Sequence, residues 1–146
     1  MRVASLLLVG LIAALPTACI KTRPRKQTAR AVPTTSIRWK GVLMTGDDSI
    51  VAFDNARHAL RNAWINRGLA AKDIRELSMA KPEQKGGVLA SNPKNLASAL
   101  RSLEVKDGDG CLIHLTSHGA PSGFYLRGDE FLTPAELDAL LDRYCG

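Results

Sequence analysis

One stretch near the C-terminus constrains the fold of this chain more than any other. Residues 107–119 read DGDGCLIHLTSHG, a polar glycine-rich turn followed by an apolar run that stops at His118 and Gly119. A short apolar run that is bounded by glycine-containing turns and flanked by helical patterns is typical of a buried β-strand. Chemistry in an open α/β sheet collects just beyond the carboxyl ends of strands, so His118 is the first candidate for a functional residue.

Before this strand, the hydrophobic pattern alternates between the periods of strands and helices. Strands are predicted at residues 37–45, which become buried on both faces, and at residues 74–79, and a loop is predicted at residues 81–91. One helix is predicted over residues 49–68, and another begins at Asn92 and Pro93. Their apolar stripes are Ile50, Phe53, Leu60 and Trp64 in the first helix, and Leu96, Leu100 and Leu103 in the second. This order predicts an α/β fold with a mostly parallel sheet and right-handed crossovers.

After the His118 strand, the sequence predicts a hairpin and a last helix. Residues 124–132 are expected to form the hairpin, with its turn at Gly128 and Asp129. Residues 133–136 read TPAE, a capping box with proline at the first helical position. The helix that they open is predicted to bury Leu137, Leu140, Leu141 and Tyr144.

The N-terminus has the pattern of an exported protein. Arg2 precedes an apolar run over residues 4–15 that is too short to span a bilayer, so residues 1–18 are predicted to be a signal peptide. Small residues before Cys19 resemble a bacterial lipobox, in which the cysteine is lipidated, although Pro16 departs from that pattern. The alternative is ordinary cleavage near Ala18 with Cys19 left free. Either way, we expect a periplasmic protein or a membrane-anchored lipoprotein of the bacterial envelope, with a possible tether through Cys19.

The positive charge of the chain is concentrated outside the predicted domain. Arg2 and the linker over residues 19–36 account for six of the 20 basic residues, so 14 remain from Ala31 onward against 14 acidic residues. A nucleic-acid-binding domain would carry basic charge on its folded surface, so no nucleic-acid partner is expected. The basic linker is either attracted to an anionic membrane surface or only a spacer.

Residues 112–119, LIHLTSHG, resemble the catalytic-histidine strand of the C13 (legumain-like) cysteine peptidases, which belong to the clan that includes the caspases. Residues 124–126 and 132–137 are similar to the bacterial members of that family, and the resemblance covers about residues 39–146. It implies a caspase-like three-layer sandwich, with a mostly parallel sheet flanked by helices, over residues 37–146. The sandwich is expected to be incomplete at its C-terminus.

The resemblance also implies roles for two residues. His118 would transfer the proton during attack on a peptide carbonyl, and the Gly119 N–H would contribute to the oxyanion hole. The substrate would be a peptide or protein, and no cofactor is expected. The family's nucleophilic cysteine lies on the next strand, whereas this sequence stops at Cys145 and Gly146. We therefore expect a truncated, inactive C13 endopeptidase domain.

Two other functions remain open at this stage. One is a catalytically inactive caspase-like envelope lipoprotein that binds peptides. The other is an unrelated envelope lipoprotein with a structural role.

Other candidate residues point less clearly to chemistry. His114 precedes His118 by four residues and would share its face of a strand, but the H-E-x-x-H pattern of a metal site is missing. We expect His114 to be packed in the core and no metal to be bound. Ser122 lacks the G-x-S-x-G elbow of a serine nucleophile and is predicted to lie in a turn. The best matches to the family's specificity residues are Asp54 and Asn55, so asparagine specificity is not carried over.

The last helix must run antiparallel to the His118 strand, which brings Cys145 back to the edge of the sheet where Cys111 begins. This placement allows either a Cys111–Cys145 disulfide in an oxidising compartment or two free thiols. It also places Cys145 at the edge opposite His118 and argues against Cys145 as the nucleophile.

Overall fold

The structure is a computed structural model that describes residues 36–146. Residues Thr35–Gly146 form one compact unit. The predicted signal peptide, Cys19 and all but the last residue of the predicted linker lie outside the described residues. Within residues 36–146, no helix has both the length and the apolar character needed to cross a membrane.

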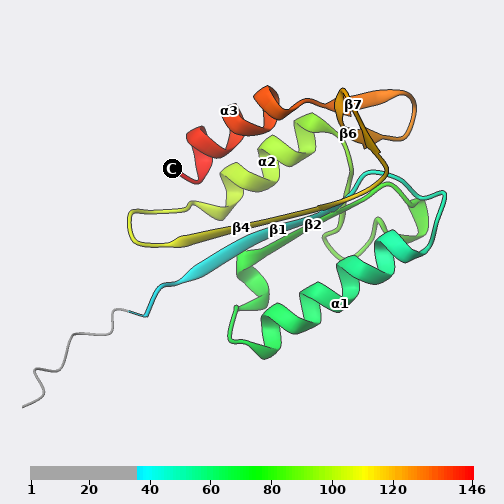
Figure 1. The fold of residues 1–146 in the computed structure, drawn as a ribbon. Coiled ribbons are helices and arrows are strands. Elements are labelled where there is room, and N and C mark those ends of the chain that lie inside the picture. The colour runs from blue at the N-terminus through cyan, green and yellow to red at the C-terminus, as the bar shows by residue number, and fades with distance from the viewer. Residues whose placement is uncertain (1–35) are drawn as a thin grey trace, which may run out of the picture. The chain divides into compact units, whose positions relative to one another are not determined.

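A four-stranded parallel sheet forms the centre of the molecule, in the order β3-β2-β1-β4. Helix α1 covers one face of this sheet, and α2 and α3 cover the other (Figure 1). A small antiparallel sheet, β5-β6-β7, follows β4. The strands are β1 (Trp39–Thr45), β2 (Ile74–Ser78), β3 (Leu89–Ala90), β4 (Gly110–Thr116), β5 (Gly119–Ala120), β6 (Gly123–Leu126) and β7 (Glu130–Leu132). The helices are α1 (Ala52–Asn66), α2 (Pro93–Leu103) and α3 (Pro134–Tyr144), with short 3-10 turns η1 (Ala71–Asp73) and η2 (Lys81–Glu83).

The hydrophobic core forms around β1, as its apolar run predicts. Every residue of β1 after Trp39 is buried, because β2 and β4 pair with it on either side and helices cover both faces. The predicted stripe of α2 is also confirmed. The core cluster contains Val42, Met44, Leu77, Leu96, Leu100, Leu103, Leu126 and Leu132.

Helix α1 departs from its predicted apolar stripe. Ile50 lies before the helix and is 46% exposed, and the buried positions of the helix are Asp54 and Arg57. Arg57 is tolerated there because it is paired: its Nε lies 2.8 Å from Asp54, and its two terminal nitrogens contact Glu76 and Glu83. The sequence did not predict this network, because a search for an apolar stripe does not place polar residues on the buried face of a helix.

The predicted helix caps and hairpin are confirmed. Asn92 Oδ1 accepts a hydrogen bond of 2.8 Å from the Asn95 N–H at the start of α2, and Thr133 and Glu136 form the capping box of α3. Strands β6 and β7 are joined through Gly128 and Asp129, both with positive φ angles. The two-residue strands β3 and β5 were not predicted.

Cys111 and Cys145 form a disulfide, with their Cα atoms 5.7 Å apart. The predicted return of the last helix to the start of the His118 strand is therefore confirmed, and of the two states that the sequence left open the structure has the disulfide. The bond joins the end of α3 to β4 at the amino end of the sheet.

Candidate active site

His118 lies at the carboxyl edge of the parallel sheet, two residues beyond the end of β4. The chain turns away from the sheet here, since the Ser117 hydroxyl donates a 2.7 Å hydrogen bond to the Tyr125 carbonyl of β6. The His118 side chain is half exposed. It therefore projects from the edge at which open α/β sheets collect functional groups.

The partners of His118 come from the loop between β1 and α1 and from the first turn of α1. Asp47 Oδ2 lies 3.3 Å from His118 Nε2, and Ser49 Oγ lies 3.4 Å from the same nitrogen. The ring of Phe53 meets the imidazole edge to face, with centroids 5.2 Å apart. Strands β1 and β4 end in register at Thr45 and Thr116, so the loops that follow them leave the sheet at the same level.

Asp47 is the buried centre of this group, with 3% of its surface exposed. It accepts a 2.9 Å hydrogen bond from the Ser49 N–H and a 2.7 Å hydrogen bond from the Ser49 hydroxyl. Burial pushes the Asp47 pKa upward, but these hydrogen bonds and the nearby His118 outweigh burial and hold the pKa below its ordinary value. Asp47 is therefore an anion at neutral pH.

The anionic Asp47 determines how a neutral His118 is oriented. A carboxylate only accepts hydrogen bonds, so its negative charge favours the tautomer of a neutral His118 with the proton on Nε2, which leaves Nδ1 as the basic nitrogen. A Ser-His-Asp triad needs serine and carboxylate on opposite ring nitrogens, whereas Ser49 and Asp47 share one nitrogen. The Ser49 hydroxyl also donates to Asp47. Ser49 thus supports the carboxylate and is not activated as a nucleophile.

A cavity of about 460 Å³ opens beside the imidazole. Arg127 borders it and fastens the β6–β7 hairpin to the β1–α1 loop, because its side chain pairs with Asp48 and its N–H donates to the Gly46 carbonyl at 2.8 Å. The volume suits one or two side chains of a peptide. The lining consists of Asp47, Ser49, His118, Gly119, Ala120, Tyr125, Arg127 and Phe131.

Gly119 is exposed at the rim of this cavity. Its φ is not positive, so no backbone conformation reserved for glycine is needed here. No heavy atom lies within 4 Å of the position that a Cβ atom would occupy. Glycine therefore leaves open space beside the backbone, which a ligand can enter.

The remaining candidates lie elsewhere. His114 packs within β4, opposite Leu43, and burial lowers its pKa. Ser122 is exposed in the turn between β5 and β6 and does not line the His118 cavity. Asp54 is neither solvated nor in that cavity, because it pairs with Arg57 in the buried network. Asn55, the neighbouring candidate, is exposed and is not among the residues that line the cavity.

Sequence reasoning did not identify Asp47 and Ser49. The available signal was the segment Gly46-Asp47-Asp48-Ser49, which directly follows a buried strand. This segment can be assigned to the site only when β1 is known to pair with β4, because that pairing brings the loop after β1 beside His118. Over residues 36–146, no cluster of three or more histidine, cysteine or acidic side chains is arranged to hold a metal ion.

The chain was compared with models of protein families, with curated proteins and with solved structures, and none of them matches it. The α/β sandwich and the geometry around His118 therefore stand on the sequence and the structure of this chain alone.

Proposed function

We propose that this chain carries part of a cysteine-type endopeptidase of the C13 kind, with a caspase-like sandwich and with His118 as its catalytic base. One observation carries the proposal. A half-exposed histidine is held by a buried carboxylate at the carboxyl edge of a parallel sheet, beside an open cavity and an unobstructed glycine backbone. The resemblance of residues 112–119 to the C13 histidine strand points to the same role.

In the proposed reaction, a cysteine thiol attacks the carbonyl carbon of a peptide bond. His118 Nδ1 takes the thiol proton and then gives it to the leaving amine, while Asp47 stabilises the imidazolium that forms between these steps. The Gly119 N–H would help to hold the negative oxygen of the tetrahedral intermediate. Water then releases the acyl group and regenerates the thiol.

The nucleophile must come from outside the described residues. Cys111 and Cys145 are joined to each other at the amino end of the sheet, far from His118. Strand β4 is the last strand in the sheet order, so its outer edge has no strand partner within residues 36–146. A further strand paired parallel to β4 there would bring its carboxyl end beside His118.

The test compares the 146-residue chain with a version extended by one apolar strand that ends in cysteine. Both are challenged with a fluorogenic peptide library and a cysteine-directed covalent probe. We expect hydrolysis and labelling only in the extended chain, and loss of hydrolysis in its His118→Ala variant. Hydrolysis by the 146-residue chain that His118→Ala abolishes would show that another residue is the nucleophile and would overturn the proposal.

A second candidate function is peptide binding without cleavage by an exported, catalytically inactive domain. The observation that favours it is the absence of a free nucleophile beside His118 among the described residues, since the Ser49 hydroxyl donates to Asp47. If neither version hydrolyses any peptide while both retain peptides on the cavity, the binding function replaces the enzymatic one.

A further inference from the structure

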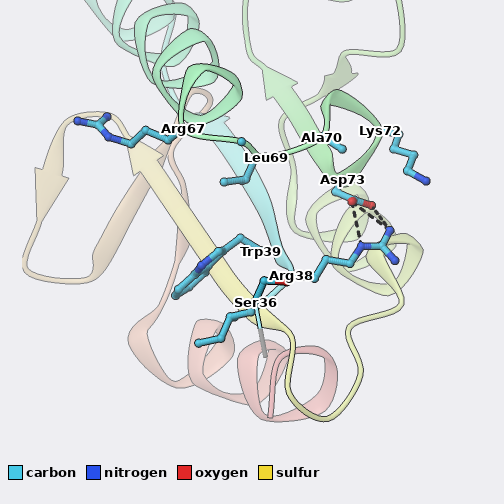
Figure 2. Close-up of a pocket in the computed structure, with 10 residues that line it drawn as sticks. Ser36, Arg38, Trp39, Arg67, Leu69, Ala70, Lys72 and Asp73 are labelled. Atoms are coloured by element: carbon cyan, nitrogen blue, oxygen red, sulfur yellow. Dashed lines mark hydrogen bonds and ion pairs between the residues drawn. The ribbon is translucent and has the colours of Figure 1, made fainter. Parts of the chain in front are cut away.

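The amino end of the sheet, opposite His118, carries a second open cavity of about 510 Å³ (Figure 2). It lies where the chain enters β1 and where η1 leads into β2. Apolar and basic side chains surround it together. We refer to Ile37, Arg38, Trp39, Arg67, Leu69 and Lys72 as the amino-end surface.

The apolar part of the amino-end surface includes two large exposed side chains. Ile37, two residues before β1, is 55% exposed, and Trp39, the first residue of β1, is 41% exposed, although the rest of the strand is buried. The Trp39 indole is held in place, because it covers Gly110, where an added Cβ atom would meet the ring at 2.3 Å. A large aromatic side chain is thus fixed at the surface and does not fold into the core.

The polar part of the surface is basic. Arg67 and Lys72 are exposed, and within residues 36–146 neither forms an ion pair. Only Arg38 is neutralised, through a 2.8 Å pair with Asp73 (Figure 2). The domain from Ala31 onward has equal numbers of basic and acidic residues, so the surplus of positive charge on this surface is local.

We propose that the amino-end surface docks onto an anionic lipid bilayer. Tryptophan favours the bilayer interface, where its ring meets the acyl chains and its N–H stays in water. Lysine and arginine beside it are attracted to anionic headgroups. Charge complementarity thus selects the lipid surface as the partner of this combination of side chains.

The point at which the chain enters the domain supports the same partner. Ser36, the first described residue, lines the cavity, and the sequence that precedes it contains Lys21, Arg23, Arg25, Lys26 and Arg30. The residues between Cys19 and Ser36 reach about 60 Å at most when extended, so a tether alone would not set the orientation of the domain. Docking of the amino-end surface would set it.

Docking in this orientation has a consequence for the proposed active site. Trp39 begins β1 and Thr45 ends it, and a strand of seven residues is about 20 Å long. Because all four strands of the main sheet are parallel, the His118 cavity lies at the end that faces away from the bilayer. The docking proposal stands independently of catalysis.

The experiment measures binding of the full chain to vesicles of phosphatidylcholine, with and without phosphatidylglycerol. An Arg67→Glu, Lys72→Glu double variant is compared with Lys81→Glu, Lys85→Glu, which makes the same change of charge on exposed residues of the η2 region. We expect the first double variant to bind anionic vesicles about tenfold more weakly than the second. The basic linker is common to both, so it cancels from the comparison. Equal binding by the two double variants would overturn the proposal.

Trp39 provides a second, site-specific readout. The chain has two tryptophans, so Trp64→Phe leaves Trp39 as the fluorescent reporter and Trp39→Phe leaves Trp64. Brominated lipids should quench Trp39 more strongly than Trp64, because Trp39 is the more exposed ring and Trp64 is half-buried and packs against Gly41. Circular dichroism verifies that each variant is folded. A folded chain that binds anionic vesicles with Trp39 unquenched would show that another part of the chain makes the contact.

Discussion

Asp47 is the residue on which the geometry around His118 depends. It receives hydrogen bonds from both the hydroxyl and the N–H of Ser49, and it lies 3.3 Å from the imidazole. Ser49 on its own has only a 3.4 Å contact with His118. The Asp47 carboxylate therefore contacts both the His118 ring and the β1–α1 loop, whereas the Ser49 hydroxyl mainly positions that carboxylate.

We expect Asp47→Ala to loosen the β1–α1 loop and to lower the free energy of unfolding by about 1–3 kcal/mol, because the Ser49 N–H and hydroxyl lose their acceptor and the imidazole loses the charge beside it. Amide hydrogen exchange should show loss of protection at Ser49. The neighbouring variant Asp48→Ala removes only the exposed pair with Arg127 and serves as the control. Equal loss of protection at Ser49 in both variants would contradict the central role of Asp47.

The candidate site could be predicted from the sequence only where it lies on one continuous stretch. His118 and Gly119 were identified because an apolar strand runs directly into them. Asp47 is some 70 residues earlier in the chain and meets His118 only through the pairing of β1 with β4. Strand order is not encoded by periodicity, so the orienting carboxylate could not be chosen from several acidic residues that follow strands.

At the scale of elements, prediction succeeded where a local pattern is long and strong. Strand β1 has a continuous apolar run, and α2 and α3 have both an apolar stripe and a capping residue. Strands β3 and β5 have two residues each, too few to show a period. The apolar stripe predicted for helix α1 was wrong in part, because its buried positions are Asp54 and Arg57, whose burial depends on partners from β2 and η2.

The Cys111–Cys145 disulfide is expected to hold α3 against β4. The bond closes a loop of 34 residues, for which the chain-entropy estimate of stabilisation is about 3–4 kcal/mol. Reduction, or replacement of both cysteines by serine, should lower the urea midpoint by a corresponding amount and increase hydrogen exchange first in α3. Mass spectrometry of unreduced material should find the linked peptide.

Cys19→Ser serves as the control for the reductant, because the disulfide is untouched in this variant. A chain whose Cys111 and Cys145 are fully alkylated without reductant, and whose urea midpoint is unchanged by reductant, would contradict the stabilising role of the bond.

At the scale of the whole domain, over residues 36–146, the carboxylates and the histidine whose pKa values are shifted all make the fold less stable as the pH falls. A hydrogen bond from Arg38 lowers the pKa of Asp73, a hydrogen bond from Lys40 lowers that of Asp109, and hydrogen bonds from Ser49 help to lower that of Asp47. Each carboxylate stabilises the fold above its ordinary value of 3.8 and loses that contribution as the pH falls through its folded pKa. Burial lowers the pKa of His114 below 6.5, so the unfolded chain binds this proton first as the pH falls.

The stability of the chain should therefore be constant above the ordinary histidine pKa of 6.5, decrease below it as the unfolded state takes up the His114 proton, and decrease further below 3.8. Urea unfolding across this range measures both steps. His114→Leu should remove the upper step and, because the buried Nε2 has no partner, stabilise the chain at neutral pH by about 1 kcal/mol. His114→Gln should also remove the upper step but keep an unpartnered polar group, and so gain no stability. An upper step that persists in both variants would show that another group binds the proton.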